Sequence, residues 1–297
     1  HPPTPPPPPP PRLNCRRQRQ MCIRDSDWGK EQALREEIVR VGRLMYERGL
    51  VVAADGNISG RLDEEYVLCT PSGLCKGMMT PEQLIVVDME GQKEGPGTTA
   101  NQDLRPTSEI LMHLEAYRRR PDIGGVVHAH PPITVALSIA GVSLADCMLP
   151  EVIVNLGLVP TTEYATPASE ENVSAIRELI SNHDGIILQR HGALTAGRNP
   201  WEAYMRLETL EQIAQITLVL QQLGQGEPLP PEQVEKLVAQ RQRMGLSHPG
   251  EEEEFCEICG VCHLDGQHVQ PSPQADTEAE LVHMITQAVL RELGHAD

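Results

Sequence analysis

Apolar residues recur at three- and four-residue spacing along several long stretches of the chain, which is the pattern of helices with one buried face. In the first stretch, from Trp28 to Gly49, the repeat includes Leu34, Ile38 and Val41. We predict further helices over residues 108–118, 132–140, 169–181, 200–223, 231–244 and 277–293. Short apolar runs predict strands over residues 60–62, 66–69, 84–88, 123–127, 152–156, 159–161 and 186–189. Because strands and helices alternate irregularly, the sequence predicts an α/β fold in which helices cover a mixed sheet.

The most informative polar residues are histidines that follow two of the predicted strands. His128 and His130 come at the end of one strand, and because side chains alternate along an extended chain, both imidazoles lie on one face. His191 follows the other strand. Together with Glu109, these histidines favour a catalytic divalent-metal site with an open position over a closed structural site. The alternative is a set of structural histidines with ordinary hydrogen-bond partners.

The composition narrows the classes of function. A formal net charge of −17 argues against a nucleic-acid-binding protein, whose surface would be basic. The chain has no apolar run of about 18 residues, so we expect no membrane-spanning segment. The eight cysteines are scattered or tightly clustered instead of spread as a disulfide framework. This distribution predicts reduced cysteines and a cytoplasmic protein.

Three polar turns precede the histidines, at residues 54–60, 70–73 and 105–109. Each turn offers hydroxyl or backbone N–H groups, and the third opens a predicted helix. Such groups at a helix N-terminus favour an anion such as phosphate. Next to a metal motif, the three turns therefore predict a phosphorylated substrate.

The order and spacing of these motifs resemble a known family, the class II aldolases of the L-fuculose-1-phosphate aldolase and adducin-head group. The motifs are Gly-Asn-Ile-Ser at 56–59, Thr-Pro-Ser-Gly at 70–73, Pro-Thr-Ser-Glu at 106–109, His-Ala-His-Pro at 128–131 and His-Gly at 191–192. The resemblance covers roughly residues 30–247. It implies a three-layer α/β/α sandwich around a mixed, largely antiparallel sheet. It also implies a homotetramer with fourfold symmetry and active sites between subunits.

The resemblance assigns roles to particular residues. His128, His130 and His191 would bind Zn²⁺ or another divalent metal, and Glu109 would be both a labile fourth ligand and the general acid/base. The residues that would line the phosphate pocket are Gly56, Asn57, Ser72, Gly73, Thr107 and Ser108. The implied reaction is the cleavage or formation of a sugar 1-phosphate, which yields dihydroxyacetone phosphate and an aldehyde through a zinc-stabilised enediolate.

One position departs from the family pattern. Fuculose-phosphate aldolases carry a tyrosine, supplied by the neighbouring subunit, where this chain has Leu149. A leucine cannot protonate the aldehyde oxygen, and Glu151 or Tyr164 are the candidates to replace it. Three alternatives therefore stay open. Two are enzymes on the same scaffold, a sugar-phosphate 4-epimerase and a dehydratase, and the third is a non-catalytic scaffold like the adducin head.

The two ends of the chain differ from the domain expected over residues 27–247. Residues 1–26 contain a proline run, and Met21–Ser26 resembles the translation of a transposon end used in sequencing libraries, so we interpret this segment as non-native and disordered. Residues 248–276 are expected to form an acidic, cysteine-rich linker. Within it, Cys256, Cys259, Cys262 and His263 offer enough ligands for a second metal, with a reduced, metal-free tail as the alternative.

The last segment, residues 277–297, predicts an amphipathic helix. Leu281, Ile285, Val289 and Leu293 repeat every four residues, so one face is apolar. After a loose linker, such a helix needs a partner surface. It resembles the encapsulation peptides that dock enzymes onto shell proteins of bacterial microcompartments, which would place the enzyme inside one. The alternative is that the helix packs on its own subunit.

Overall fold

The structure of the chain is a computed structural model that describes residues 15–95, 97–224 and 226–261. The helix expected within 277–297 lies outside the described residues, as do Cys262 and His263.

A single antiparallel sheet forms the centre of the domain. Its strands follow one another across the sheet in the order β3-β2-β1-β4-β6-β5. All neighbouring strands run antiparallel, and the parallel pairing recorded is an isolated bridge between Thr161 and Ile187. The strand bounds are β1 Asn57–Arg61, β2 Tyr66–Cys69, β3 Ile85–Asp88, β4 Gly125–Ala129, β5 Gly185–Leu188 and β6 Gly192–Gly197.

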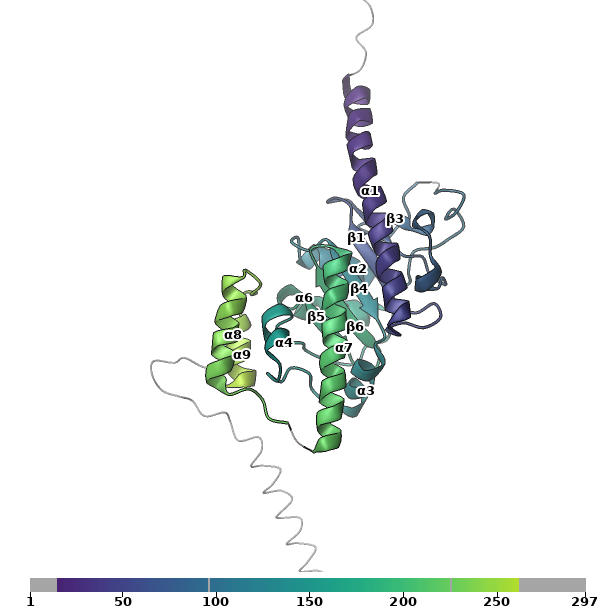
Figure 1. Cartoon of the computed structure of the whole chain (residues 1–297). Helices are drawn as coiled ribbons and strands as arrows, with labels where there is room; N and C mark the ends of the chain where they lie inside the picture. The colour runs from purple at the N-terminus through teal and green to yellow at the C-terminus, as the bar shows by residue number, and fades with distance from the viewer. Residues whose placement is uncertain (1–14, 96, 225, 262–297) are drawn as a thin grey trace, which may run out of the picture.

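Helices cover both faces of this sheet and complete the expected three-layer α/β/α sandwich (Figure 1). One face packs against α1 Cys15–Glu47, α3 Pro132–Ala140 and α7 Pro200–Leu223. The other face packs against α2 Ile110–Arg119, α5 Glu170–Arg177 and α6 Leu179–Asn182. Two 3₁₀ turns, Lys76–Met78 and Pro81–Gln83, connect β2 to β3. None of the described helices is long and apolar enough to cross a membrane.

The alternation of side chains in β4 decides which layer holds the histidine. Val127 and Ala129 belong to the core cluster on the α1, α3 and α7 side, whereas Val126 belongs to the cluster on the α2 side. Because neighbouring side chains in a strand point to opposite faces, His128 lies on the α2 side with Val126. The strand therefore turns one imidazole toward the N-terminal end of α2.

Three predicted elements differ from the structure, and one strand was not predicted. Residues 152–156, expected as a strand, fall in helix α4 Pro150–Asn155 and the residue after it, and residues 159–161 contribute only the bridge at Thr161. Strand β6 was not predicted, because its sequence Gly-Ala-Leu-Thr-Ala-Gly lacks an apolar run. The first helix begins at Cys15 instead of Trp28, so it includes part of the segment interpreted as non-native.

Two further helices, α8 Pro231–Arg243 and α9 Glu251–Cys259, pack beside α4. Phe255 of α9 is buried in a small cluster with Val234 of α8 and Ile153 of α4. Part of the expected acidic, cysteine-rich linker over 248–276, residues 251–259, is therefore a helix packed on the domain. The four acidic residues at the start of α9 are favourable there, because the N-terminal end of a helix carries partial positive charge.

Candidate metal centre

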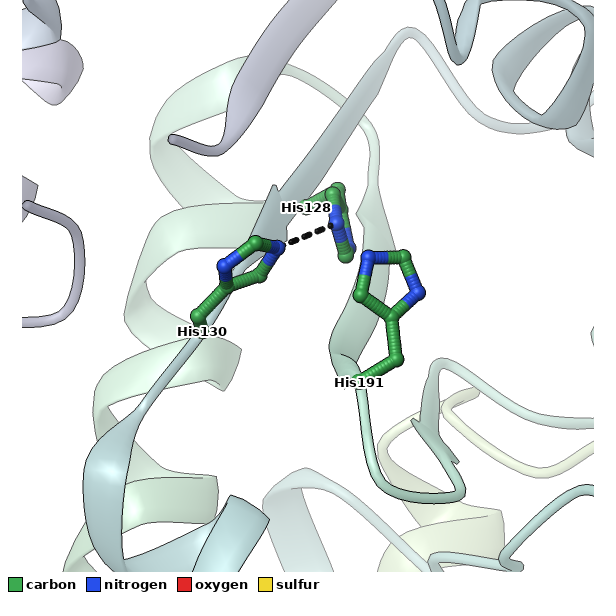
Figure 2. A group of neighbouring side chains, drawn as sticks. All are labelled: His128, His130 and His191. Carbon is green, nitrogen blue, oxygen red and sulfur yellow. Dashed lines mark hydrogen bonds between the residues drawn. The ribbon is translucent and has the colours of Figure 1, made fainter. Parts of the chain in front are cut away.

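Three histidines from two chain segments converge at one end of the central strands (Figure 2). His128 lies in β4, and His130 follows it immediately before α3. His191 lies in the turn between β5 and β6, and β6 pairs with β4. Glu109 stands at the N-cap of α2, on the same side of the sheet as His128. The antiparallel pairing of β4 and β6 therefore assembles the predicted histidine set.

The potential ligand atoms lie close together. Nε2 of His128 is 3.1 Å from Nε2 of His130 and 3.2 Å from Oε2 of Glu109. Nε2 of His191 is 3.4 Å from Oε1 of Glu109. Atoms bonded at zinc–nitrogen distances in a tetrahedral site stand about 3.3 Å apart. The observed spacing therefore fits a small divalent cation held by these side chains.

Hydrogen bonding leaves the correct nitrogen of His128 available. Nδ1 of His128 lies 2.9 Å from the carbonyl oxygen of Ala193. A carbonyl oxygen only accepts, so Nδ1 carries the hydrogen and Nε2 keeps its lone pair for a metal. In the described part of the chain, Oε1 of Glu109 is buried and accepts no hydrogen bond. A buried carboxylate oxygen that accepts no hydrogen bond, beside three imidazoles, is a set of donor atoms that a cation would satisfy.

Burial and neighbouring side chains shift the pKa values of Glu109, His130 and His191. Burial alone raises the pKa of Glu109, but His128 and the amide of Asn57 lower it by more, so the pKa lies well below its ordinary value. Burial and the neighbouring His128 lower the pKa of His191 to about 4. Burial also lowers the pKa of His130, whose Nδ1 stands 3.6 Å from a carboxylate oxygen of Asp55. An ionised carboxylate and neutral imidazoles are the protonation states that bind metal.

Two glycines allow the backbone to come this close. A Cβ at Gly192 would stand 2.2 Å from the carbonyl oxygen of Ala129 and 2.9 Å from the ring of His130. Gly56 has a φ of +71°, and a Cβ there would lie 2.9 Å from the carbonyl oxygen of His128. Side chains at either position would push apart the segments that carry the histidines.

The structure also brings the three predicted turns together. The N–H of Ser72 donates to the carbonyl of Arg105, and the N–H of Thr107 donates to the carbonyl of Thr70, so two of the turns pair. The remaining turn, residues 54–60, reaches the site through Asn57, whose amide donates to Oε2 of Glu109 at 2.9 Å.

The six predicted phosphate-pocket residues do not all remain free to bind an anion. Ser72, Gly73 and Ser108 are exposed, and a Cβ at Gly73 would meet open space. Gly56 is buried against β4. Thr107 is buried, and its hydroxyl accepts the N–H of Glu109. The exposed members therefore offer the accessible surface, while Thr107 orders the start of α2.

Sequence reasoning missed four buried polar residues behind the site. Lys76 is 2% exposed, and its ammonium donates to the carbonyl of Ala54 in the first turn and to that of Leu74, directly after the second turn. Burial lowers the pKa of Lys76 to about 8. The other three are Ser59, His113 and Tyr117. Nothing in the sequence marked Lys76, but Glu109, His113 and Tyr117 follow one another at four-residue spacing, which places them on one face of a helix.

At the second predicted metal site, the described cysteines are disulfide-bonded in the structure. Cys259 forms a disulfide with Cys147, with a Cα–Cα distance of 6.1 Å, and Cys256 is also disulfide-bonded. A sulfur in a disulfide is not a thiolate ligand. The expectation of reduced cysteines is therefore wrong for these residues. Because Cys262 and His263 lie outside the described residues, a metal site in the reduced chain stays a prediction.

Leu149, the residue that departs from the family pattern, is the N-cap of α4, and its side chain packs against the main core cluster. Glu151 lies exposed in the first turn of α4, and Tyr164 is 60% exposed. The hydrogen bonds and ion pairs of the described residues link neither of them to the histidines. Neither proposed substitute for the tyrosine is therefore in place within one chain.

Comparison with known proteins finds similar enzymes that act on phosphorylated compounds. The 3-oxo-tetronate 4-phosphate decarboxylase of Escherichia coli K12 is 32% identical over 200 residues, which is 66% of this chain and 91% of that protein. The L-fuculose phosphate aldolase of Methanococcus maripaludis is 33% identical over 188 residues, which is 63% of this chain and 97% of that protein.

The same likeness holds for solved structures and for the family as a whole. The L-fuculose-1-phosphate aldolase of Thermus thermophilus superposes with a TM-score of 0.54 at 32% identity, covering 66% of this chain and 98% of that one. The model of the class II aldolase and adducin N-terminal domain matches residues 36–218, which is more than half of the chain. The chain therefore belongs to the class II aldolase and adducin N-terminal domain family.

Proposed function

We propose that the chain is a metal-dependent lyase that breaks a carbon–carbon bond next to a carbonyl group in a phosphorylated, sugar-derived substrate. The observation that carries this proposal is the convergence of three imidazoles with Glu109 at ligand spacing. A scaffold protein has no need of this set, and a buried carboxylate without a full set of partners is costly to keep.

His128, His130 and His191 would hold the metal, and Zn²⁺ is the ion that the family resemblance favours. A divalent cation bound there would polarise a substrate carbonyl oxygen as a Lewis acid. The exposed Ser72, Gly73 and Ser108 support an anion at the substrate's phosphate end. The four groups around the metal and this anion site would orient the substrate between them.

Aldol cleavage of a sugar 1-phosphate, such as L-fuculose 1-phosphate, is the first candidate reaction. The hydroxyl group beta to the carbonyl gives its proton to solvent, the carbon that bears this hydroxyl leaves as an aldehyde, and the electron pair of the broken bond moves onto the carbonyl. Glu109 takes up a proton from solvent and gives it to the substrate carbon that lost the bond, which restores the carbonyl.

Decarboxylation of a phosphorylated 3-oxo acid is the second candidate, and Leu149 favours it. In that reaction the carboxylate leaves as carbon dioxide, and the electron pair moves onto the carbonyl. Glu109 takes up a proton from solvent and gives it to the carbon that lost the carboxylate, which restores the carbonyl. No leaving aldehyde oxygen has to exchange a proton, so a leucine packed in the core costs the reaction nothing. The decarboxylases among the relatives support the same choice.

The two reactions are separated by incubating the metal-loaded protein with L-fuculose 1-phosphate and with 3-oxo-tetronate 4-phosphate. Aldehyde release from the first identifies an aldolase, and carbon dioxide release from the second identifies a decarboxylase. A third incubation, with a ribulose phosphate, tests the alternatives. Its epimerisation, or loss of water from any of the three compounds, without carbon–carbon cleavage of the first two, would contradict the lyase proposal and support the epimerase or the dehydratase.

The role of Glu109 has a separate test. Glu109→Gln should lower kcat by about 10²-fold or more, because a positioned acid/base contributes about that much. The matched control is Glu90→Gln, at an exposed turn after β3, which should leave kcat unchanged. Undiminished turnover of Glu109→Gln would contradict the assigned role.

A further inference from the structure

A row of buried polar side chains connects the centre of α2 to the metal site. On α2 and its N-cap, Glu109, His113 and Tyr117 recur every four residues and share one face. On the neighbouring β1, Asn57 and Ser59 are two residues apart and share one face. The helix face and the strand face meet, and all five side chains are at most 9% exposed.

These side chains form an unbroken chain of hydrogen bonds. The hydroxyl oxygens of Tyr117 and Ser59 are 2.9 Å apart, and the Ser59 hydroxyl lies 2.7 Å from Nδ1 of His113. Nε2 of His113 lies 2.5 Å from Oδ1 of Asn57. Asn57 then donates from Nδ2 to Oε2 of Glu109.

The direction of every hydrogen bond follows from the carboxylate end. An ionised Glu109 only accepts, so Asn57 must turn its NH₂ toward it and its carbonyl oxygen toward His113. That oxygen also only accepts, so Nε2 of His113 carries the ring hydrogen. Nδ1 is then an acceptor and takes the hydroxyl hydrogen of Ser59, whose oxygen accepts from Tyr117.

The charge state of His113 agrees with this direction. Burial, with a contribution from His128, lowers the pKa of His113 to about 3. The ring is therefore neutral at neutral pH and carries one hydrogen, as the chain requires. Rotation of the Asn57 amide by half a turn would place two oxygens against each other at Glu109 and two N–H groups against each other at His113. Both contacts are unfavourable in a buried site.

We propose that Tyr117, Ser59 and His113 form a hydrogen-bond relay that positions the Asn57 amide and, through it, the Glu109 carboxylate. These three are positioning residues, since they act through Asn57 and not on substrate. Their effect on turnover rests on the proposed acid/base role of Glu109. The tautomer that the relay imposes on His113 does not depend on that role.

The first test changes the relay at its middle and at its far end. His113→Phe keeps the ring volume and removes both hydrogen bonds, so kcat should fall about 10- to 100-fold, as it does when partners of metal-site ligands are removed. Tyr117→Phe removes the last bond of the relay, and kcat should fall by less than it falls in His113→Phe. In both variants KM should change less than about threefold, because the exposed Ser72, Gly73 and Ser108, which would bind the anion, make no contact with the relay.

The matched control is His183→Phe. His183 is also buried, and it also makes two hydrogen bonds, to the carbonyl of Leu179 and to Glu254, at the opposite end of β5 from His191. This variant should lower stability and leave kcat unchanged. An equal loss of kcat in His183→Phe and His113→Phe would show a general folding defect and contradict the relay.

A double-mutant cycle shows whether His113 acts through Glu109. In the Glu109→Gln background, His113→Phe should cause no further loss of kcat, because the group that it positions is gone. Two losses that multiply would overturn the proposal. If His113→Phe does not fold, Ser59→Ala with Glu109→Gln completes the same cycle.

Nitrogen NMR of the full-length protein with isotope-labelled histidine tests the relay without any substrate. The ring-nitrogen shifts of His113 should report hydrogen on Nε2 only. Hydrogen on Nδ1, or on both nitrogens, at neutral pH would overturn the proposal even in an active enzyme. Conversely, full activity of Glu109→Gln with the expected tautomer would contradict the proposed function and leave the relay standing.

Discussion

At the scale of single residues, the site depends on a cross-strand pair. Asn57 of β1 and His128 of β4 are register partners in the sheet. The side-chain amide of Asn57 donates a hydrogen bond to the Glu109 carboxylate, and the imidazole of His128 contacts the same carboxylate. The carboxylate at the start of α2 is therefore fixed from two neighbouring strands at once.

His113 gives a pH dependence of stability whose sign follows from its pKa. The pKa is about 3 in the folded chain, below the unfolded value of about 6.5, because burial disfavours the charged ring. Above the unfolded pKa the group has no effect. As the pH falls from 6.5 toward 3, the unfolded chain binds a proton that the folded chain rejects, so stability is lost at up to about 1.4 kcal/mol per pH unit.

We therefore expect His113→Phe to unfold with a flatter pH dependence than the parent chain below pH 6.5. The variant also loses hydrogen bonds, but that cost is a constant offset at all pH values. Urea unfolding between about pH 7.5 and 4.5 measures both curves. Parallel curves over the whole range would contradict the buried, neutral state of His113.

The histidine cluster was predictable because its signal is local. His-x-His at the end of a strand fixes the face of two ligands, whatever the rest of the fold does. The relay was not predicted, since it requires knowing that α2 packs on β1. A histidine and a tyrosine within a helix otherwise look like ordinary members of an apolar face.

At the scale of elements, α4 shows where local pattern fails. Val-Ile-Val at 152–154 is β-branched and predicts a strand, but a short apolar run fits a buried helix equally well. Pro150 occupies the first helical turn, where its missing N–H and fixed φ are favourable. For strand β6 the error is the opposite one, because the local pattern predicts no strand where the structure has one. Its small residues pack between two other strands, and all six are buried.

The attachment of α8 and α9 depends on a buried ion pair. Arg241 of α8 is fully buried, and its guanidinium donates to Glu251 of α9 at 2.8 Å and to the carbonyl of Val154 in α4 at 2.9 Å. Glu251→Gln would remove the nearer charge partner of the buried guanidinium and leave it the more distant carboxylate of Asp184, at 3.8 Å. We expect a loss of about 3 kcal/mol of stability, confined first to these helices.

Hydrogen exchange locates that loss. Backbone amides of α8 and α9 should exchange faster in Glu251→Gln, while those of the central sheet keep their protection. Arg198→Gln is the control, because Arg198 is 81% exposed in its pair with Glu202, and surface pairs contribute about 1 kcal/mol or less. Unchanged exchange in α8 and α9 would mean that the disulfide and the Phe255 cluster hold the helices without the ion pair.

At the scale of the whole molecule, the family domain and the C-terminal helices are separate features. The family model ends at residue 218, whereas α8 and α9 lie beyond it and are joined to the domain by Cys147–Cys259. The homotetramer and the docking of residues 277–297 on a shell protein stay predictions. The histidines and Glu109 that we propose as metal ligands converge within one chain, so their assignment does not depend on either prediction.

Metal quantification of the purified full-length protein tests the central claim most directly. The account predicts one divalent ion per chain, lost in His191→Ala and retained in His183→Ala. Circular dichroism of both variants confirms that the fold is intact. A parent protein without divalent metal after incubation with Zn²⁺, or a His191→Ala variant that binds as much metal as the parent, would contradict it.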